Sequence, residues 1–328
     1  MLDMKASYTT IRNTVGVYQR GNKVLTITGS QRLEYTQFLL AKSIEFARID
    51  TCIDSILLDA DAHPVGTAVA MIREDTIELV VEAPPTWFDH AVEIQQRYDI
   101  QVDYSTAIAI QVEGPHSWKV AATLVADREI SDILLNECVD AELNGEAIYL
   151  ARAGTTAEYG YLIISSSRTT LDNLVECAES LGGGLIDPTV LNRIHAETNY
   201  PIIPEQFQGT SIFECGLPWM ASVTRTDAFL GSEKLELKPP SRRTVAAIFS
   251  GHDCPPMGTA VFVDGDSVGT LLVSTDRAGQ EDGLGLLLMD DPYGVPGVGV
   301  EIAGTLGVTV SRPVVAPLSW SIGIGVEE

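Results

Sequence analysis

The stretch FECGLPWMASVTRTDAFLGSEKL, residues 213–235, places an acid, Glu214, at the start of an apolar run. The run from Gly216 to Val223 is typical of a short strand or the start of a helix, and Gly231 is typical of a turn or a helix boundary. Both patterns are local, and neither assigns a role to an acid in apolar surroundings. Its role has to be inferred from the order of elements along the whole chain.

The composition indicates a folded chain with more than one domain. Its 328 residues are 45% hydrophobic, which is enough for a sizeable core in two or three domains. No apolar run approaches the roughly 18 residues that a membrane-spanning helix needs, so we expect no membrane partner. Residues 1–14 lack the apolar segment of a secretory signal peptide, and we therefore expect a cytoplasmic protein.

The charge balance is strongly acidic, with 45 Asp and Glu against 21 Lys and Arg and a formal net charge of −24. Such a surface repels nucleic-acid phosphates. Since no basic cluster is longer than Arg242-Arg243, we expect no nucleic-acid partner. The acidity fits either a saline cytoplasm or a general gain in solubility. The sequence does not indicate the oligomeric state.

Metal sites and disulfides are not expected. The cysteines are odd in number, far apart and never in a CxxC spacing, and the histidines are too scattered for a metal triad. Most of the cysteines are expected to be small buried hydrophobes. The residues are Cys52, Cys138, Cys177, Cys215 and Cys254, and His63, His90, His116, His195 and His252.

The first 184 residues mix strands and helices without a steady alternation of the two. Residues 14–29 alternate like a hairpin with its turn at Gly21-Asn22, and residues 30–46 read as a helix capped by Ser30. This mixture favours an α+β class, with antiparallel sheets backed by helices. Further strands are expected over 53–60, 66–72, 76–84, 146–154 and 158–166, and further helices over 86–98, 130–139 and 169–184, the last ended by Gly182 to Gly184.

The pattern changes at LKPPSRR, residues 237–243, where two prolines cannot continue a helix. Beyond it the chain reads as short strands separated by glycine turns, which is typical of a small β-barrel or sandwich of roughly 85 residues. We therefore predict two domains, residues 1–238 and residues 239–328. We also expect no long helix between residues 245 and 310.

Motifs of several common enzyme classes are absent. There is no GxGxxG after a strand, no GxxxxGK[ST] and no HExxH. Residues 182–184, three glycines, follow a helix rather than a strand, so they favour a helix cap over a phosphate site. His195 lies in RIHAE, beside Arg193 and Glu197. Two interpretations stay open there, a functional cluster and polar residues on an exposed helix face.

Four segments, in order and with suitable lengths between them, resemble the glycine-cleavage T-protein family, the tetrahydrofolate-dependent aminomethyltransferases. They are RAGTTAEYGYLII (152–164), LNRIHAETNYPIIPEQF (191–207), GLPWMASVTRTDAFLGSEKL (216–235) and the run from GTAVFVDGDSVGTLLVS (258–274) to DPYGVPGVGVEIAG (291–304). The resemblance spans nearly the whole chain. It implies an α+β folate-binding fold of two mixed α/β lobes plus a C-terminal β-barrel around a central channel. It also implies that Glu214 and Gly216 shape the channel wall and that Phe229 to Gly231 form the turn that closes it.

The sequence departs from the family at several polar positions. The family's aspartate pair, which handles the substrate amine, matches Gly66 and Thr67, so no carboxylate stands there. Little or no aminomethyl transfer from a lipoyl carrier protein is therefore expected. An asparagine, an acid and an arginine of the family match Glu82, Leu162 and His195. A leucine cannot accept hydrogen bonds from a pterin, and a buried donor left unpaired costs about 1–3 kcal/mol.

A related group of folate proteins, which assist iron–sulfur enzymes, shares the same scaffold. Its motif carries a cysteine where TDAFLGSE, residues 226–233, has Ala228. That group is therefore disfavoured.

The function that the resemblance implies is a divergent tetrahydrofolate-dependent one-carbon transferase that acts on a small molecule. Thr67 and Glu82 would face the substrate as candidate catalytic residues. Two alternatives stay open: a non-catalytic folate-binding or interaction protein, and a pathway-specific enzyme that uses the channel without folate. For Trp219, core packing is a further alternative. The candidate cofactor-binding residues are Glu158, Tyr161, His195, Glu197 and Trp219.

Overall fold

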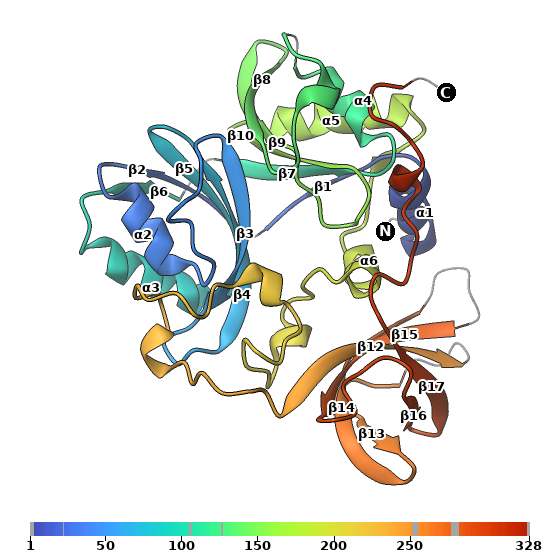
Figure 1. Cartoon of the computed structure of the whole chain (residues 1–328). Helices are drawn as coiled ribbons and strands as arrows, with labels where there is room; N and C mark the ends of the chain where they lie inside the picture. Colours follow the sequence, from blue (N-terminus) through green and yellow to red (C-terminus); the bar gives the residue numbers. More distant parts are fainter. Residues whose placement is uncertain are drawn as a thin grey trace.

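The computed structural model describes residues 3–21, 23–104, 107–125, 127–250, 255–276 and 282–326. These residues form a five-stranded sheet, a six-stranded sheet and a closed six-stranded barrel (Figure 1). The predicted α+β class, with mixed α/β lobes and a C-terminal barrel, is confirmed. No helix of the described part is long and apolar enough to cross a membrane. Three residues named above, Asn22, His252 and Cys254, lie outside the described residues.

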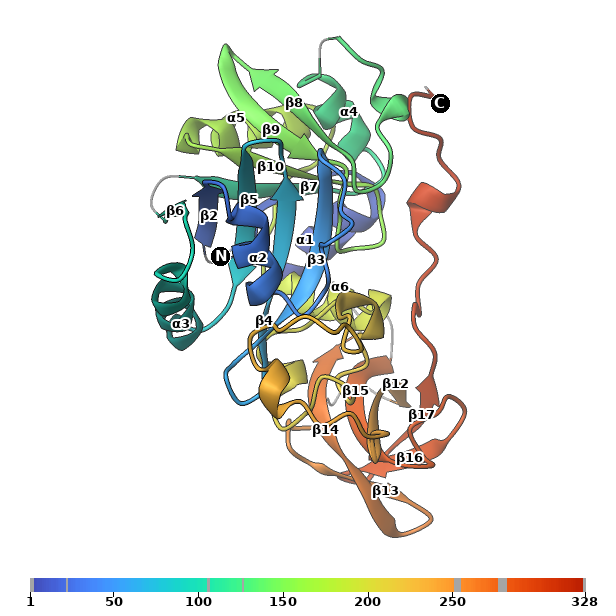
Figure 2. The same ribbon diagram turned by 60° about the vertical axis from the view of Figure 1, so that its left-hand side comes forward.

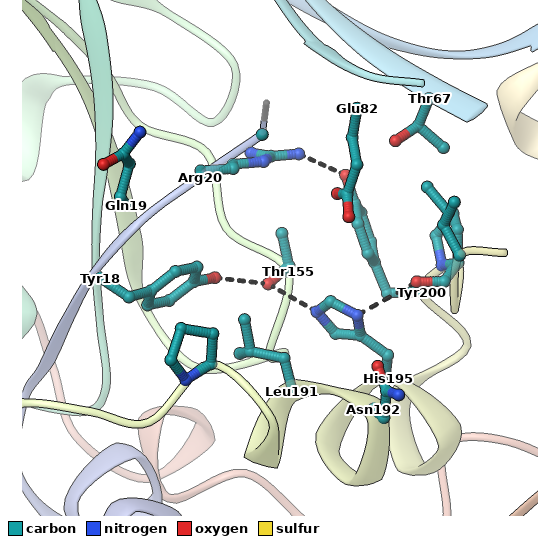
Figure 3. Close-up of a pocket in the computed structure, with 14 residues that line it drawn as sticks. Tyr18, Gln19, Arg20, Thr67, Glu82, Thr155, Leu191, Asn192, His195 and Tyr200 are labelled. Carbon is teal, nitrogen blue, oxygen red and sulfur yellow. Dashed lines mark hydrogen bonds between the residues drawn. The ribbon is translucent and has the colours of Figure 1, made fainter. Parts of the chain in front are cut away.

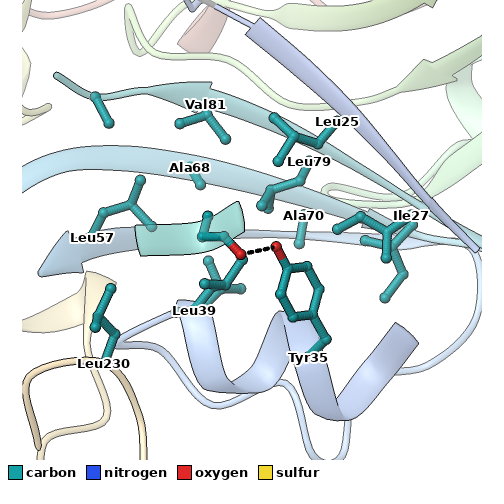
Figure 4. Packing of buried hydrophobic residues seen from close by; sticks show 14 of the residues in the cluster. Leu25, Ile27, Tyr35, Leu39, Leu57, Ala68, Ala70, Leu79, Val81 and Leu230 are labelled. Atoms are coloured by element: carbon teal, nitrogen blue, oxygen red, sulfur yellow. Dashed lines mark hydrogen bonds between the residues drawn. The ribbon is translucent and has the colours of Figure 1, made fainter. Parts of the chain in front are cut away.

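The five-stranded sheet is antiparallel, with strand order β3-β4-β5-β2-β6. Helices α2 (Arg32–Leu39) and α3 (Pro85–Gln95) pack on one face over a core of aliphatic and aromatic side chains (Figure 4). Tyr35 is fully buried there, and its hydroxyl donates to the carbonyl of Ala91 at 3.0 Å. The strands are β2 (Lys23–Thr28), β3 (Thr51–Leu58), β4 (Pro64–Ile72), β5 (Thr76–Glu82) and β6 (Gln101–Asp103).

The helix predicted over residues 30–46 is shorter than expected and is capped differently. The hydroxyl of Ser30 donates to the Asp99 carboxylate at 2.7 Å instead of capping the helix. The helix ends before Ala41, whose backbone N–H donates to the carbonyl of Ile56 in β3 at 3.2 Å. A hydrogen bond to the neighbouring strand thus replaces the next helical one.

The six-stranded sheet has the order β11-β1-β7-β10-β9-β8. Helices α4 (Ser117–Ala122) and α5 (Arg168–Ser180) pack on one face. The other face packs against the five-stranded sheet, where Val69 and Val80 of one sheet meet Tyr149 and Leu162 of the other. The predicted end of α5 is confirmed, because Gly182 has φ of +78°. The strands are β1 (Gly16–Gln19), β7 (Ile108–Glu113), β8 (Cys138–Leu143), β9 (Glu146–Ala151), β10 (Gly160–Ser165) and β11 (Gly184–Leu185).

The hairpin predicted over residues 14–29 is wrong, although both of its strands exist. β1 lies between β7 and β11 in the six-stranded sheet, and β2 lies between β5 and β6 in the other sheet. An isolated hairpin would leave an unpaired edge on each strand, whereas here each strand has a partner on both sides. The chain therefore crosses between the two sheets at Arg20 and Gly21.

The helix predicted over residues 130–139 is also wrong. Only a short 3-10 turn, Ile130–Asp132, forms before β8 begins at Cys138. The carboxylate of Glu137 accepts the backbone N–H of Leu134 at 2.7 Å, which closes a local turn. Asn136 has a left-handed φ of +63°, a conformation that a right-handed helix cannot contain.

The barrel follows the strand-only pattern of the sequence, and the described residues between 245 and 310 contain no long helix. The chain then leaves the barrel after Val310 and runs back to the end of the molecule that carries α4 (Figure 2). The division into residues 1–238 and 239–328 stays a prediction. The barrel strands are β12 (Arg242–Ser250), β13 (Ala260–Val263), β14 (Asp266–Asp276), β15 (Asp282–Asp290), β16 (Gly299–Ile302) and β17 (Thr305–Val310), and the remaining helices are α1 (Met4–Asn13) and α6 (Val190–Thr198).

Candidate functional site

A polar cavity of about 190 Å³ lies where the two sheets meet α6 (Figure 3). Its walls come from the end of β1, from β4 and β5, from the loop before β10, and from α6 with the turn that follows it. The cavity joins segments that are far apart in the sequence, which is typical of ligand sites between structural layers. The lining residues are Tyr18, Gln19, Arg20, Gly21, Thr67, Glu82, Thr155, Pro188, Leu191, Asn192, His195, Tyr200, Pro201 and Ile203.

Two of the predicted residues form one wall. Thr67 of β4 and Glu82 of β5 are paired directly across the two strands, so their side chains leave the same face of the sheet. Thr67 is buried, whereas Glu82 keeps part of its surface in contact with solvent. Desolvation raises the pKa of the Glu82 carboxyl, and the charge of Arg20 offsets part of that shift. Glu82 can therefore exchange a proton at a higher pH than an ordinary glutamate.

A second wall is held by Arg20, which sequence reasoning missed. Its guanidinium donates to Gln111 of β7 at 3.1 Å, to Asp54 of β3 at 3.1 Å, and to the hydroxyl of Tyr200. The same hydroxyl donates to Asp54 at 2.7 Å. The side chains of Arg20 and Asp54 are only 10% and 17% exposed. This ion pair joins both sheets to the segment after α6. The additional hydrogen bonds to Gln111 and Tyr200 offset the cost of burying the two charges.

His195 of α6 lines the cavity as an uncharged ring. Its Nδ1 lies 3.1 Å from the carbonyl of Pro201, and its Nε2 lies 3.1 Å from the hydroxyl of Thr155. Because a carbonyl only accepts, Nδ1 carries the proton and Nε2 accepts from Thr155. Burial, together with the charge of Arg20, lowers the pKa of His195 to about 3. Asn199, with φ of +71°, ends α6 and turns the chain back toward the ring.

Glu197 lies on α6 but does not line the cavity. Its carboxylate accepts from Arg193 at 2.6 Å, from Arg12 at 2.8 Å and from the hydroxyl of Tyr8 at 3.0 Å. Arg193 and Glu197 are 4% and 1% exposed, so the interpretation of an exposed polar helix face is wrong. The network fastens α1 to α6, and it occupies the oxygens that were predicted to bind a cofactor.

Glu158 also lies outside the cavity. It accepts the backbone N–H of Ser319 at 2.9 Å, the hydroxyl of the same residue at 2.5 Å, and the N–H of Leu318 at 3.2 Å. Its carboxylate thus holds the C-terminal segment against the six-stranded sheet. These contacts satisfy the buried carboxylate within the chain.

Tyr161 and Trp219 are the remaining predicted residues. Tyr161 of β10 is fully buried in the core beneath α4 and α5, and its hydroxyl has no hydrogen-bond partner in the described part of the chain. Trp219 is 42% exposed, so it is not a core residue, and its ring lies 6.1 Å from the ring of Tyr200. Of the seven predicted residues, the three that line the cavity are Thr67, Glu82 and His195.

The stretch around Glu214 joins the lobes to the barrel instead of lining the cavity. The Glu214 carboxylate pairs with Arg242 at 3.0 Å. Its backbone carbonyl accepts the N–H of Thr244 at 3.0 Å and the hydroxyl of the same residue at 2.7 Å. Residues 216–223 hold no strand, only the 3-10 turn Pro218–Met220. The buried acid is therefore a tether between two parts of the fold.

The turn at Phe229 to Gly231 closes against the five-stranded sheet and does not line the cavity. Leu230 is buried in the core beneath α2, and its N–H donates to the carbonyl of Phe38 at 2.8 Å. Gly231 has φ of +82°, and a Cβ there would lie 2.5 Å from the carbonyl oxygen of Asp59. Both facts require glycine at this position.

Sequence reasoning missed the other lining residues, and four of those have hydrogen-bond partners that are distant in the sequence. Thr155 lies in the segment 152–164, which resembles the T-protein family, and that position was the one available signal for it. The other three residues line the cavity because the chain crosses from one sheet to the other after β1 and turns back after α6. No local pattern predicts either feature. These residues are Tyr18, Arg20 and Tyr200.

No family model matches the chain. It is 24% identical over 319 residues to an aminomethyltransferase of Listeria monocytogenes, covering 91% of this chain and 85% of that protein. It is 20% identical over 312 residues to an aminomethyltransferase of Lysinibacillus sphaericus, with the same coverage.

A solved structure has a similar fold. It is the glycine cleavage system aminomethyltransferase T from Bartonella henselae, with a TM-score of 0.81, 17% identity, and coverage of 96% of this chain and 90% of that chain. The two packed sheets with a closed barrel are therefore a T-protein-like fold. In sequence over 91% of its length, and in fold, the chain is similar to aminomethyltransferases.

Proposed function

We propose that this protein is a tetrahydrofolate-dependent one-carbon transferase that acts on a small molecule, with its site in the cavity between the sheets and α6. The observation that carries the proposal is the pairing of Thr67 with Glu82. The acid that the family resemblance places at positions 66 and 67 is missing, but Glu82 supplies a carboxyl group from the next strand. The cavity therefore keeps a group that can accept hydrogen bonds from a pterin or pair with an amine.

The shape of the surroundings fits the cofactor. The cavity shares Glu82 and Ile203 with an apolar groove of about 460 Å³. Tetrahydrofolate has a polar bicyclic head followed by an aromatic ring, and the polar cavity and the apolar groove follow each other in that order. The groove's apolar lining residues include Pro64, Val65, Pro84, Pro85, Pro204 and Phe207.

The chain's own residues would bind, orient and shield the reactants. Bound tetrahydrofolate would supply the nitrogen atoms that carry the one-carbon unit. Glu82 would accept hydrogen bonds from the bound molecule, and the Thr67 hydroxyl would form the neighbouring contact. The ion pair of Arg20 with Asp54 fixes the opposite wall, so that the reacting groups are held together.

Thermal unfolding with and without ligand tests this proposal. A ligand at 100 times its Kd adds about 2.7 kcal/mol to the free energy of unfolding, so tetrahydrofolate should raise the unfolding temperature. A fragment without the bicyclic head, p-aminobenzoylglutamate, should raise it much less. If millimolar tetrahydrofolate gives no shift, the folate proposal is wrong, and a ligand other than folate has to be sought.

A transfer assay then separates an enzyme from a binding protein. The protein is incubated with tetrahydrofolate that carries a ¹³C-labelled methylene group and with a panel of small amines, and the label is followed by NMR. We expect the label to appear on one of the amines faster than in the reaction without protein. Binding without such transfer would support the folate-binding protein that the sequence left open.

A further inference from the structure

The C-terminal segment, residues 311–326, returns from the barrel past α6 (Figure 1). The proposed function does not use it, and none of its residues lines the cavity. It contacts two elements of the cavity wall, which are α6 and the loop of residues 152–159 between β9 and β10. Because its partners Glu158 and Glu197 do not line the cavity, the segment reaches this wall from outside.

The first contact fixes the end of α6. The backbone N–H of Val314 donates to the carbonyl of Glu197 at 2.9 Å. That carbonyl belongs to the last turn of α6, where a helix leaves its carbonyl groups unpaired. The side chain of Val314 packs against the cluster that contains Ala196 and Ile202. The segment therefore completes the end of the helix two residues after His195.

The second contact fixes the loop. The Glu158 carboxylate accepts the backbone N–H groups of Leu318 and Ser319 at 3.2 and 2.9 Å, and the Ser319 hydroxyl at 2.5 Å. The Ser319 oxygen in turn accepts the backbone N–H of Tyr159 at 2.9 Å. Glu158 and Ser319 are 6% and 5% exposed. Apart from Arg12 at 3.5 Å, the described residues that donate to this carboxylate all belong to the segment.

The loop and α6 meet each other on the cavity wall (Figure 3). There the Thr155 hydroxyl lies 3.1 Å from Nε2 of His195. Arg12 of α1 forms a second link, because it donates to the carbonyl of Thr156 at 2.7 Å and to the carboxylate of Glu197 at 2.8 Å. The segment forms a third link between the same loop and the same helix.

The position of the loop depends on these contacts, because residues 152–159 belong to no helix or strand. A buried carboxylate that loses a donor is costly, so Glu158 without the Ser319 hydroxyl would shift toward water. Thr155 lies only three residues before Glu158, and its hydroxyl would then move relative to His195. A misplacement of about 1 Å is enough to impair the geometry of a bound reactant.

We propose that the C-terminal segment positions the cavity wall, with Ser319 and Glu158 as positioning residues that hold Thr155 against His195. Neither positioning residue touches the ligand, since both act through the loop. The segment and the cavity are therefore coupled in both directions. Release of the segment weakens ligand binding, and a ligand bound against this wall stabilises the segment. The ligand part of this coupling rests on the proposed function, whereas the effect on His195 does not.

Nitrogen NMR of the His195 ring tests the positioning without any ligand. Ser319→Ala removes the hydroxyl and leaves the rest of the segment in place. The Nε2 resonance of His195 should shift in this variant, because the hydrogen bond from the Thr155 hydroxyl is altered. A role of Ser319 in stability alone would not move that resonance.

Thr309→Val is the matched control for a loss of stability. The Thr309 hydroxyl is also buried, and it lies in the barrel. It donates to the carbonyl of Val295 at 2.7 Å and accepts the backbone N–H of Val298 at 2.8 Å, so it has the same pattern of bonds as Ser319. The control should unfold more readily than the wild type but keep the wild-type His195 resonances.

Tyr159→Phe is a second, milder release of the segment, for the case that Ser319→Ala does not fold. The Tyr159 hydroxyl donates to the carbonyl of Ile322, farther along the segment. This variant should shift the Nε2 resonance of His195 as well. If neither Tyr159→Phe nor folded Ser319→Ala shifts it, the proposal is overturned.

Limited proteolysis tests the coupling to the ligand. Saturating tetrahydrofolate should slow cleavage within residues 311–326 of the wild type. Ser319→Ala should raise the Kd for tetrahydrofolate at least about fivefold, the lower end of typical coupling factors, and Thr309→Val should not change it. Binding without protection, and with the wild-type Kd in Ser319→Ala, would overturn the coupling. If the wild type binds no tetrahydrofolate, the folate proposal fails, and the His195 resonance alone decides the positioning.

Discussion

Thr67 and Glu82 are paired across β4 and β5. The carboxyl group of the cavity therefore lies on β5, one strand away from the positions where the family resemblance places an acid. The family resemblance places an acid at Gly66 or Thr67, on β4. Here Glu82 of β5 lines the same cavity as Thr67. A cross-strand neighbour can replace a missing side chain because paired residues share one face of a sheet.

The backbone at Gly66 should not accept any side chain. A Cβ there would lie 2.2 Å from the carbonyl oxygen of Glu82, and a backbone atom cannot move aside as a flexible side chain can. We expect Gly66→Ala to lower the free energy of unfolding by about 3 kcal/mol, the upper end of the range for overpacking. Gly299→Ala is the control, since Gly299 lies in β16 with open space around it. Equal stabilities of the two variants in urea would contradict this account.

Restoring an acid at position 67 should make stability depend on pH. In Thr67→Asp the new carboxyl group lies beside Glu82, and like charges raise both pKa values. A raised folded-state pKa gives stability that is present below the unfolded pKa and is lost as pH rises through the folded pKa. Urea unfolding should therefore show Thr67→Asp losing stability relative to Thr67→Asn between pH 5 and pH 8. A constant difference between the two variants would show that the carboxyls do not interact.

The sequence predicted the elements better than their pairing. Alternation identified the strands around residues 16–19 and 23–28, since the apolar positions recur every second residue. It could not show that they belong to different sheets, because the partners of β1 lie about 95 and 168 residues further along the chain. Partners at that distance depend on the packing of the whole fold, so a local pattern cannot specify them.

The family resemblance predicted where candidate site residues stand in the chain, but it did not predict which side chains contact one another in the fold. Thr67, Glu82 and His195 were placed by resemblance and do line the cavity. Glu158 lies outside the cavity, and its partner, Ser319, is 161 residues away, where no local pattern predicts it. A buried acid in a sequence indicates a partner but does not say whether that partner is a ligand or another part of the chain.

The hydroxyl of Tyr200 should contribute measurably to the stability of the fold through the ion pair of Arg20 and Asp54 on the cavity wall. It donates to the Asp54 carboxylate at 2.7 Å and is 9% exposed as a residue. We expect Tyr200→Phe to cost about 1.5–3 kcal/mol, the range for hydrogen bonds to charged groups. Tyr104→Phe is the control, because Tyr104 donates to the neutral amide of Gln95 at 3.0 Å and should cost about 0.5–1.5 kcal/mol. Denaturant unfolding that ranks the two in the opposite order would refute the charged contact.

The C-terminal segment should be fastened through Ser319. Its hydroxyl donates to Glu158 at 2.5 Å and accepts the N–H of Tyr159 at 2.9 Å. We expect Ser319→Ala to cost about 1.5–3 kcal/mol and to speed proteolysis of the residues after Val310. Ser321→Ala should change neither property, because that hydroxyl is exposed and bonds only a nearby carbonyl, that of Leu318. Unchanged proteolysis of Ser319→Ala would mean that the segment is held by other contacts.

Calorimetric titration with tetrahydrofolate decides whether Glu82 contacts the bound ligand. If Glu82 accepts hydrogen bonds from the ligand, Glu82→Gln should weaken binding by about 1.5–3 kcal/mol. Wild-type affinity should rise as pH rises through the pKa of Glu82, which lies above the usual value, and the affinity of Glu82→Gln should not.

Glu78→Gln provides the matched control for this titration. Glu78 lies on the same strand and bonds Thr26 at 2.6 Å, outside the cavity. Glu78→Gln should bind tetrahydrofolate with wild-type affinity, whereas Glu82→Gln should bind it more weakly and without dependence on pH. Equal affinities in all three proteins, or no heat from the wild type at millimolar tetrahydrofolate, would contradict this prediction.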